Sequence, residues 1–138
     1  MKIKVVLDNG AYMPQKAHKE DAGFDLRTPE DVIIFPNSSV TIDIGVHIEI
    51  PFGYVGFLKS KSGLYVKNGI VSEGVIDCGY TGSIVAKLYN NSDNAKTFKA
   101  GDKITQLVLL PIPDVELLQV EKLGETERGD NGFGSTGR

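Results

Sequence analysis

The most regular pattern in the chain is the alternation of apolar and polar positions between Val40 and Ile50. Val or Ile occupies every second position, and Thr, Asp, Gly, His and Glu lie between them. Successive side chains of a strand point to opposite faces, so an alternating segment can bury one face and expose the other. The pattern predicts one long, half-buried strand over residues 40–50 and excludes a helix.

Other short apolar segments also predict strands, because they are rich in Val, Ile and aromatic residues and are bounded by turn residues. About one helical turn is predicted over residues 64–68. The further strands are predicted at residues 2–7, 32–35, 54–58, 70–76, 82–89, 103–110 and 115–121. Many short strands with no alternation of strand and helix predict an all-β fold, which would be a sandwich, a jelly roll or a barrel.

The chain has 138 residues, which is enough for one domain with a single core. The composition changes at Gly124, after which Phe133 is the single large apolar residue. We therefore predict a β domain over residues 1–123 and a flexible, Gly-rich arm over residues 124–138. Taken alone, such a terminus is a disordered tail. An aromatic ring between two glycines, near Arg128, would also suit a lid over a ligand that has both a ring and a phosphate.

Charge and cysteine content narrow the class of protein. The net charge is −3 and the basic residues are scattered, which argues against a nucleic-acid surface. Cys78 is the only cysteine, so an internal disulfide is impossible and a reducing compartment is indicated. The apolar part of residues 1–7 is too short for a signal peptide, and the longest apolar run, residues 107–112, is too short to span a membrane. We expect a soluble protein of the cytoplasm, or of the host cytoplasm if the gene is viral, with no membrane partner and no direct nucleic-acid binding.

The segment from Gly74 to Gly82 carries the most distinctive candidate chemistry. Strand-forming residues lead into Asp77, and turn residues follow, which predicts a hairpin with Asp77 at its entrance and Tyr80 near its tip. Taken alone, an ordinary hairpin with a surface Asp would explain the pattern. Cys78 has no nearby His to support a nucleophile, so a small packing residue is the preferred interpretation.

Several common active sites are absent from the sequence. There is no P-loop, no zinc-deaminase motif and no zinc-protease helix motif. The two histidines, His18 and His47, fall on polar positions and are interpreted as solvent-facing, so a nucleophilic triad is disfavoured.

The remaining polar residues suit the hydrolysis of a phosphoanhydride. The carboxylates are Asp77 and Asp25, and the donors to an anion are Lys61, Ser62, Gln106 and Arg128. A single Asp can deprotonate a water molecule. The charge of a triphosphate needs Lys, Arg and a divalent metal such as Mg²⁺ to neutralise it.

Five segments together resemble the motifs of the homotrimeric dUTPases, the dUTP diphosphatases, and they occur in that family's order over nearly the whole chain. They are Ala22-Gly23-Phe24-Asp25-Leu26, Lys61-Ser62-Gly63-Leu64, Gly74 to Gly82, Gly101 to Leu107, and Arg128 to Gly137. The resemblance implies a jelly-roll subunit and a homotrimer with active sites shared at the subunit boundaries. It also implies that dUTP and water give dUMP and pyrophosphate, which limits uracil incorporation into DNA and supplies dUMP for thymidylate synthesis.

The resemblance assigns roles around the third motif. Asp77 would activate the water that attacks the α-phosphorus. Tyr80 would lie against the deoxyribose and exclude a 2′-hydroxyl. The backbone of Gly74, Val75 and Ile76 would read the uracil edge and leave no room for a 5-methyl group.

The first, second and fourth motifs would serve the phosphates and the metal. By the same resemblance, Lys61, Ser62 and Gly63 would hold the phosphates, and Gln106 would bond to one of them. Asp25 would help to position a hydrated Mg²⁺ through water, with the metal held mainly by the triphosphate.

The fifth motif would close the site. Phe133 would stack on the uracil, while Arg128 and the backbone of Gly134, Ser135 and Thr136 would clamp the γ end of the triphosphate.

Two positions depart from the family pattern. Lys61 stands where the family usually has Arg, which keeps the charge but loses the bidentate fork. Gly79 stands where a second Asp is often found. Two alternatives stay open: a dCTP deaminase-like enzyme, against which the short chain and the tail argue, and a non-catalytic nucleotide-binding regulatory module, against which Asp77 argues.

Overall fold

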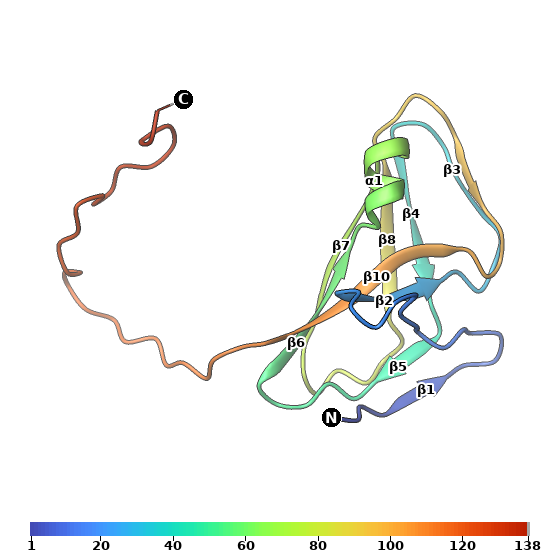
Figure 1. The fold of residues 1–138 in the computed structure, drawn as a ribbon, viewed down its shortest axis with the longest axis horizontal. Helices are drawn as coiled ribbons and strands as arrows, with labels where there is room; N and C mark the ends of the chain where they lie inside the picture. Colours follow the sequence, from blue (N-terminus) through green and yellow to red (C-terminus); the bar gives the residue numbers. More distant parts are fainter. Residues whose placement is uncertain (138) are drawn as a thin grey trace.

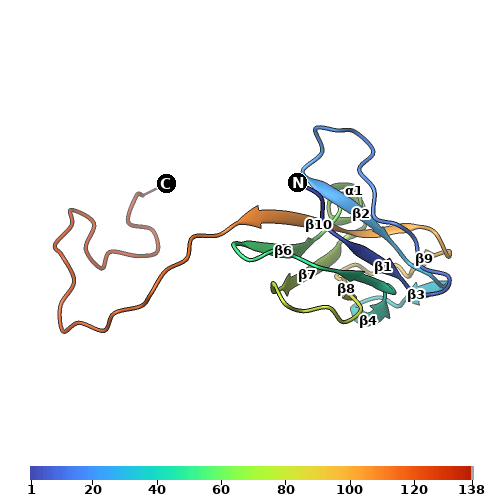
Figure 2. The same cartoon turned by 90° about the horizontal axis from the view of Figure 1, so that it is seen from below.

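Antiparallel strands curl around an apolar interior, and the chain then leaves this body as an extended arm (Figures 1 and 2). The computed structural model describes residues 1–137. In chain order the elements are β1 (Val5–Leu7), β2 (Gly23–Arg27), β3 (Val32–Ile34), β4 (Ser38–Asp43), β5 (Val46–Ile48), β6 (Tyr54–Lys59), α1 (Ser62–Asn68), β7 (Ile70–Ile76), β8 (Val85–Asn90), β9 (Lys96–Phe98) and β10 (Lys103–Pro111).

The main sheet has six strands in the order β2-β10-β6-β7-β8-β4, and β1-β5 and β3-β9 form two smaller ladders. The strand pairs are antiparallel. The predicted all-β, jelly-roll class is confirmed. Within residues 1–137, no helix has both the length and the apolar character needed to cross a membrane.

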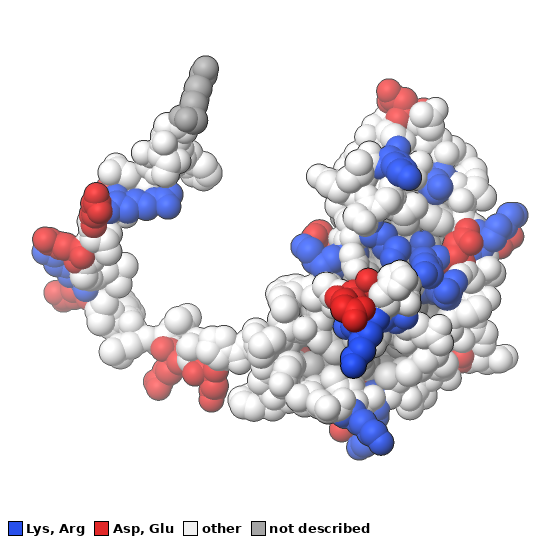
Figure 3. Space-filling view, in the orientation of Figure 1, with Lys and Arg blue, Asp and Glu red and all other residues white. Residues whose placement is uncertain are grey.

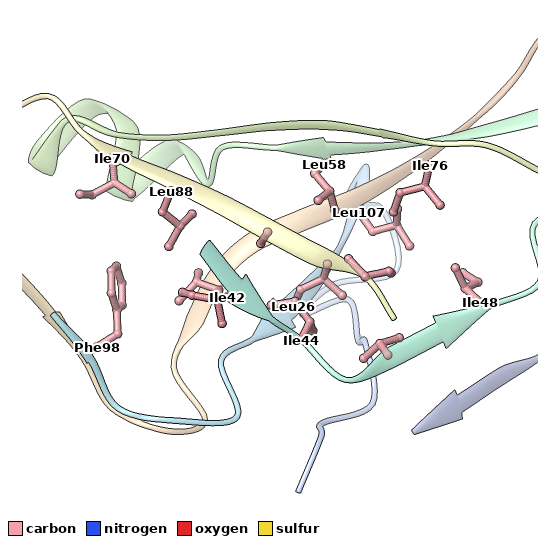
Figure 4. Packing of buried hydrophobic residues seen from close by; sticks show 14 of the residues in the cluster. Leu26, Ile42, Ile44, Ile48, Leu58, Ile70, Ile76, Leu88, Phe98 and Leu107 are labelled. Atoms are coloured by element: carbon pink, nitrogen blue, oxygen red, sulfur yellow. The ribbon is translucent and has the colours of Figure 1, made fainter. Parts of the chain in front are cut away.

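Aliphatic side chains from most of the strands fill the interior (Figure 4). In β8 the side chains alternate between exposed and buried, so that Ala86 and Leu88 point into the core. Each fully buried Ile or Leu contributes about 1.5–3 kcal/mol of hydrophobic free energy. Packing at Gly56 is tight enough to exclude a side chain, because a Cβ there would lie 2.9 Å from Ile50 Cδ1 and 3.0 Å from Leu107 Cδ1.

The predicted strand over residues 40–50 is wrong in one respect, because the structure breaks it into β4 and β5 at Gly45. Gly45 has φ 72°, a left-handed conformation that favours glycine. Its N–H donates to Asp43 Oδ1 at 2.9 Å and Ser83 Oγ at 3.0 Å, which fixes a corner. β4 pairs with β8 and β5 pairs with β1. Ile42, Ile44, Val46 and Ile48 all stay buried on either side of the corner, which explains why the apolar pattern shows no interruption there, although Gly45 between them is buried as well.

The prediction of a strand over residues 115–121 is also wrong, since these residues pair with no strand within residues 1–137. The last bond of the body is from Ile112 N to Gly53 O at 2.8 Å. Beyond it Leu117 and Leu118 are almost fully exposed.

The helix α1 is longer than the single turn expected. It ends at Asn68, and the next residue, Gly69, closes the cap with a φ of 65°.

Candidate functional site

A buried carboxylate holds two ammonium groups at the first part of the candidate site. Asp25 lies on β2, and its side chain is only 9% exposed. Lys103 Nζ, at the start of β10, lies 2.8 Å from Asp25 Oδ2. The Nζ of Lys61, the residue before α1, contacts Asp25 Oδ1. Two predicted site residues, Asp25 and Lys61, are thus brought together.

Strand register brings Gln106 to the same place. Gln106 pairs with Asp25 across β10 and β2, and its Nε2 donates to Ser60 O at 2.9 Å. Gly23 leaves room for this side chain, because a Cβ at Gly23 would collide with Gln106 Oε1. Asp25, Gln106, Lys61 and the first residues of α1 therefore gather at one end of the sheet.

Lys103 was not among the predicted site residues, although it lies within the fourth motif. Its signal in the sequence is the cation that follows Gly101-Asp102 at the start of β10. Lys103 also lines a shallow hollow together with Arg27 and Lys96. Figure 3 shows Lys and Arg side chains gathered across the middle of this face of the body. A polyanion would be attracted to this surface.

The two lysines change the acidity of Asp25. Burial opposes ionisation of the carboxyl and would raise its pKa. The hydrogen bonds and positive charges of Lys103 and Lys61 outweigh burial, so the pKa of Asp25 lies below its ordinary value of 3.8. A carboxyl whose pKa is lower in the folded state stabilises the fold above its unfolded pKa. That stability is lost as the pH falls through the folded value.

We expect Asp25→Asn to lower the free energy of unfolding at neutral pH by about 1–3 kcal/mol, because Lys61 and Lys103 lose the counter-ion that holds them. Urea unfolding at neutral and acidic pH measures this, and the deficit should shrink as acid protonates Asp25 in the parent. Asp31→Asn is the matched control, since Asp31 pairs with Lys99 on the surface. Equal stability of the Asp25 variant and the parent at neutral pH would contradict the role of this carboxylate.

The second part of the candidate site is the loop after β7, which carries Asp77 and Tyr80. β7 pairs with β8 only from Ile70 to Ser72, so the predicted hairpin opens into a wide loop over residues 77–84, with Asp77 at its entrance. Tyr80 N donates to Asp77 O at 3.2 Å, and Tyr80 Oη donates to Ser83 O at 2.8 Å. Asp77 is exposed at the mouth of this loop.

Two neighbours of Asp77 have distinct local roles. Gly79 has φ 84°, so the Gly that departs from the family pattern supplies a left-handed turn conformation. The thiol of Cys78 is exposed in this chain, so the prediction of a packing residue is wrong here. A turn residue at the tip of a loop has no core to pack against.

The backbone of Gly74, Val75 and Ile76 is open on one side. These residues pair with Leu58, Phe57 and Gly56 of β6. On the opposite side the ladder to β8 ends at Ser72, and the Val75 side chain is exposed. An unpaired strand edge presents N–H and C=O groups that can bind a planar ligand with donors and acceptors along its own edge.

The two parts of the site lie far apart within one chain. The register aligns Asp25, Gln106, Lys59 and Glu73 in one row across β2, β10, β6 and β7. Asp77 follows Glu73 by four residues, which is about 13 Å along the strand, and the row itself spans about 14 Å. The Asp25 cluster and Asp77 are therefore separated by roughly 19 Å, which no side chain bridges.

The arm that carries the fifth motif also lies away from the body (Figure 2). Arg128 Nε donates to Asn131 O at 2.9 Å, and Ser135 N donates to Gly132 O at 3.0 Å. Phe133 is fully exposed. The arm residues from Arg128 to Thr136 line a hollow of their own. One chain thus presents the predicted site residues as three separate groups.

Known proteins resemble the chain over its full length. A family model described as dUTPase matches residues 9–137. The chain belongs to the dUTPase family. It is 43% identical over 142 residues to the deoxyuridine 5′-triphosphate nucleotidohydrolase of Nautilia profundicola, with all of both chains covered. It is 40% identical to that of Clostridium tetani, with 100% of this chain and 97% of the relative covered.

Solved dUTPase structures share the fold. The Staphylococcus bacteriophage 80alpha dUTPase with dUpNHpp has a TM-score of 0.92 and 34% identity, with 99% of each chain covered. A mutant dUTPase from phage phi11 of S. aureus, solved to describe the coordination of a structural Mg(II) ion, has a TM-score of 0.82 and 33% identity, with 88% of this chain and 98% of that chain covered. The resemblance to the dUTPases is confirmed. Neither the deaminase alternative nor the regulatory alternative is supported by these relatives.

Proposed function

We propose that this chain hydrolyses dUTP to dUMP and pyrophosphate, in active sites that are shared between the subunits of a homotrimer. The separation of the Asp25 cluster from Asp77 is the observation that carries the shared site. The nucleotidohydrolase relatives and the five motifs support the reaction. The reaction would limit uracil incorporation into DNA and supply dUMP for thymidylate synthesis.

Exposed apolar residues support an assembly of several chains. The segment between β10 and the arm holds Val115, Leu117, Leu118 and Val120, which are exposed in the isolated chain although their sequence favours a strand. A strand needs a partner for its backbone groups, and large apolar side chains gain free energy when they are covered. A neighbouring subunit supplies both, and it would carry the fifth motif to the body of another chain.

Asp77 acts as the general base. Its carboxylate takes a proton from a bound water molecule as the water oxygen forms a bond to the α-phosphorus. The bond between the α-phosphorus and the bridging oxygen breaks, and the electron pair leaves with pyrophosphate. Asp77 stands at the mouth of its loop with its carboxylate exposed, which suits a base that must meet a ligand brought by another subunit.

The Asp25 cluster faces the opposite end of the triphosphate. Lys61 and Lys103 neutralise the charge that grows on the leaving pyrophosphate, and Gln106 donates to a phosphate oxygen. Ser62 and Gly63 are the first residues of α1. Ser62 contributes a hydroxyl, and Gly63, which has open space where a Cβ would stand, contributes a backbone N–H. Because Lys61 offers a single ammonium where Arg would offer a fork, it binds the phosphates as a point charge.

The β7 edge and the loop after it select the nucleoside. The open backbone from Gly74 to Ile76 reads the uracil edge and leaves no room for a 5-methyl group. Tyr80 lies against the deoxyribose and excludes a 2′-hydroxyl. The arm then covers the base with Phe133, because a flat pyrimidine binds well to an aromatic face.

The arm adds further positive charge and hydrogen-bond donors around the triphosphate. Arg128 and the backbone N–H groups of Gly134, Ser135 and Thr136 clamp the γ end. An arm that orders over the bound ligand excludes water other than the attacking molecule.

Magnesium fits this chain as part of the substrate. Asp25, the predicted outer ligand, is engaged by Lys61 and Lys103, so its carboxylate does not fit as a direct metal ligand. Residues 1–137 contain no group of three His, Cys, Asp or Glu side chains placed to hold a metal. We infer that Mg²⁺ enters on the triphosphate oxygens, which it binds while keeping several waters.

The cytoplasm suits this function. The exposed thiol of Cys78 lies next to Asp77, and a reducing compartment keeps it free of disulfides.

Pyrophosphate release from dUTP, dTTP, dCTP and UTP in the presence of Mg²⁺ tests the proposed function. We expect dUTP alone to be hydrolysed efficiently, because the other three differ at the positions that the β7 edge and Tyr80 read. Ammonia release from dCTP would indicate the deaminase alternative. Tight binding of dUTP without any pyrophosphate would overturn the reaction and favour a regulatory module.

A further inference from the structure

His47 connects the N-terminal strand to the loop that carries Tyr80, and the sequence had indicated only a solvated surface residue there. Its Nδ1 lies 2.7 Å from Thr81 O, and its Nε2 lies 3.0 Å from Asp8 Oδ1. The His47 side chain is 28% exposed, so the ring is partly covered. His47 thus faces solvent as predicted, but both of its ring nitrogens have partners.

The chemistry of the two partners decides which form of the ring fits. A backbone carbonyl and an ionised carboxylate only accept hydrogen bonds, whereas neutral imidazole carries a single N–H. Only the imidazolium donates to both Thr81 O and Asp8 Oδ1 at once. Loss of the proton leaves one ring nitrogen with its lone pair facing another lone pair, so one of the two bonds is lost.

The charged groups around the ring favour the protonated form. Asp8 follows β1, and Asp43 ends β4. Lys4 and Glu49 line the same hollow as His47, and they neutralise each other in an ion pair of 3.3 Å. The pKa of His47 is raised above its ordinary value of 6.5. The largest cause is the bond to Thr81 O, and the bond to Asp8 and the charges of both aspartates act in the same direction.

The loop that His47 holds is tied to the body at a second point as well. Ser83 Oγ donates to Asp43 Oδ1 and accepts from Gly45 N at 3.0 Å. Tyr80 Oη donates to Ser83 O at 2.8 Å. Residues 80–83 are thus fixed by the Ser83 bonds on one side and by the proton on His47 on the other.

We propose that protonated His47 is a positioning residue for Tyr80, and that discrimination between dUTP and UTP weakens when His47 loses its proton. This inference rests on the proposed function, because it assigns the exclusion of a 2′-hydroxyl to Tyr80. His47 touches no substrate atom and acts only through the carbonyl of Thr81 and the position of the loop.

The direction of the pH dependence follows from the raised pKa of His47. The pKa of His47 is higher in the folded state than its unfolded value of 6.5. The bonds of protonated His47 are therefore fully formed below pH 6.5, and they are lost as the pH rises through the pKa of the folded state. The loop is therefore firmest in mildly acidic solution and loosest in alkali.

The experiment measures kcat/KM for dUTP and for UTP from about pH 6 to about pH 9, since histidine titrates in this region. Both substrates use the same base and the same leaving group, so pH effects on the chemical step cancel in the ratio of their kcat/KM values. We expect the dUTP-to-UTP ratio of the parent to fall by about fivefold across this range, which is the effect of one hydrogen bond.

Variants separate His47 from other titrating groups. We expect His47→Gln to give a low ratio that no longer changes with pH, because its amide is uncharged and does not titrate. Asp8→Asn should move the fall in the ratio to lower pH. His18→Gln is the matched control, since His18 lies in an exposed segment, and it should behave as the parent does.

A titration followed by nuclear magnetic resonance tests the same link without catalysis. We expect the His47 ring to titrate above pH 6.5, with the amide signals of Tyr80 and Thr81 moving at the same pH. A parent that hydrolyses dUTP with a constant dUTP-to-UTP ratio, or loop signals that ignore the His47 titration, would overturn the inference. A parent that fails to hydrolyse dUTP while the loop signals follow His47 would refute the proposed function and leave the His47 link supported.

Discussion

Replacing Asp77 by Asn is expected to lower kcat for dUTP by about 10²–10⁴-fold, the usual contribution of a general base. The amide has the size and shape of the carboxylate but accepts no proton from water. Its loop should keep its conformation, because the bond from Tyr80 N is made to the backbone oxygen of Asp77 and not to its side chain. The affinity for dUTP should therefore stay nearly unchanged.

Steady-state pyrophosphate release measures kcat for dUTP, and calorimetric titration with dUpNHpp measures the affinity of the site for the nucleotide. Asp93→Asn is the control, since Asp93 lies in the exposed turn between β8 and β9. Turnover of the Asp77 variant within a few-fold of the parent would refute the role of Asp77 as the base.

Deleting residues 128–138 is expected to lower kcat/KM for dUTP by about 10²–10³-fold, because the deletion removes the cover of the base and part of the clamp on the triphosphate. The thermal midpoint should hardly change. Residues 128–137 are exposed, and the hydrogen bonds that they form are local to the arm. The arm thus adds little to the stability of the body.

A single substitution in the arm gives a graded version of the same test. Phe133→Ala should raise KM by about tenfold, which is the loss of stacking on one base. Glu125→Gln, which precedes the fifth motif, is the control. Light scattering on the truncated protein checks its assembly, and dissociation of the trimer on truncation would show that the tail is structural and not a cover for the site.

Sequence periodicity predicted some strands closely and failed where the backbone turns without a change of pattern. β7 coincides with its predicted range, and β10 exceeds its predicted range by one residue, because both are continuous segments of strand-forming residues. The corner at Gly45 escaped prediction, since Val or Ile continues to occupy every second position on both sides of it. The segment 115–121 has the composition of a strand, but composition cannot supply the partner that pairing requires.

The members of the candidate site could be named from the sequence, but their arrangement could not. The motifs named Asp25, Lys61 and Gln106 as site residues, and the structure places all three at one end of the sheet. The separation of this cluster from Asp77 depends on the order and register of the strands, which no local pattern contains. Lys103 was overlooked because a single cation at the start of a strand usually faces solvent. The role of His47 required the positions of its two acceptors.

Mixing two inactive variants tests most directly whether each site is built from more than one chain. One variant is Asp77→Asn, and the other carries Lys61→Ala together with Gln106→Ala. Each should be inactive as a pure trimer. After the two are unfolded together in equal amounts and refolded, we expect activity to return in roughly a quarter of the sites, because each site draws its base and its phosphate cluster from different chains at random. If every site lay within one chain, each chain would still carry a lesion, and a mixture as inactive as its components would refute the shared site.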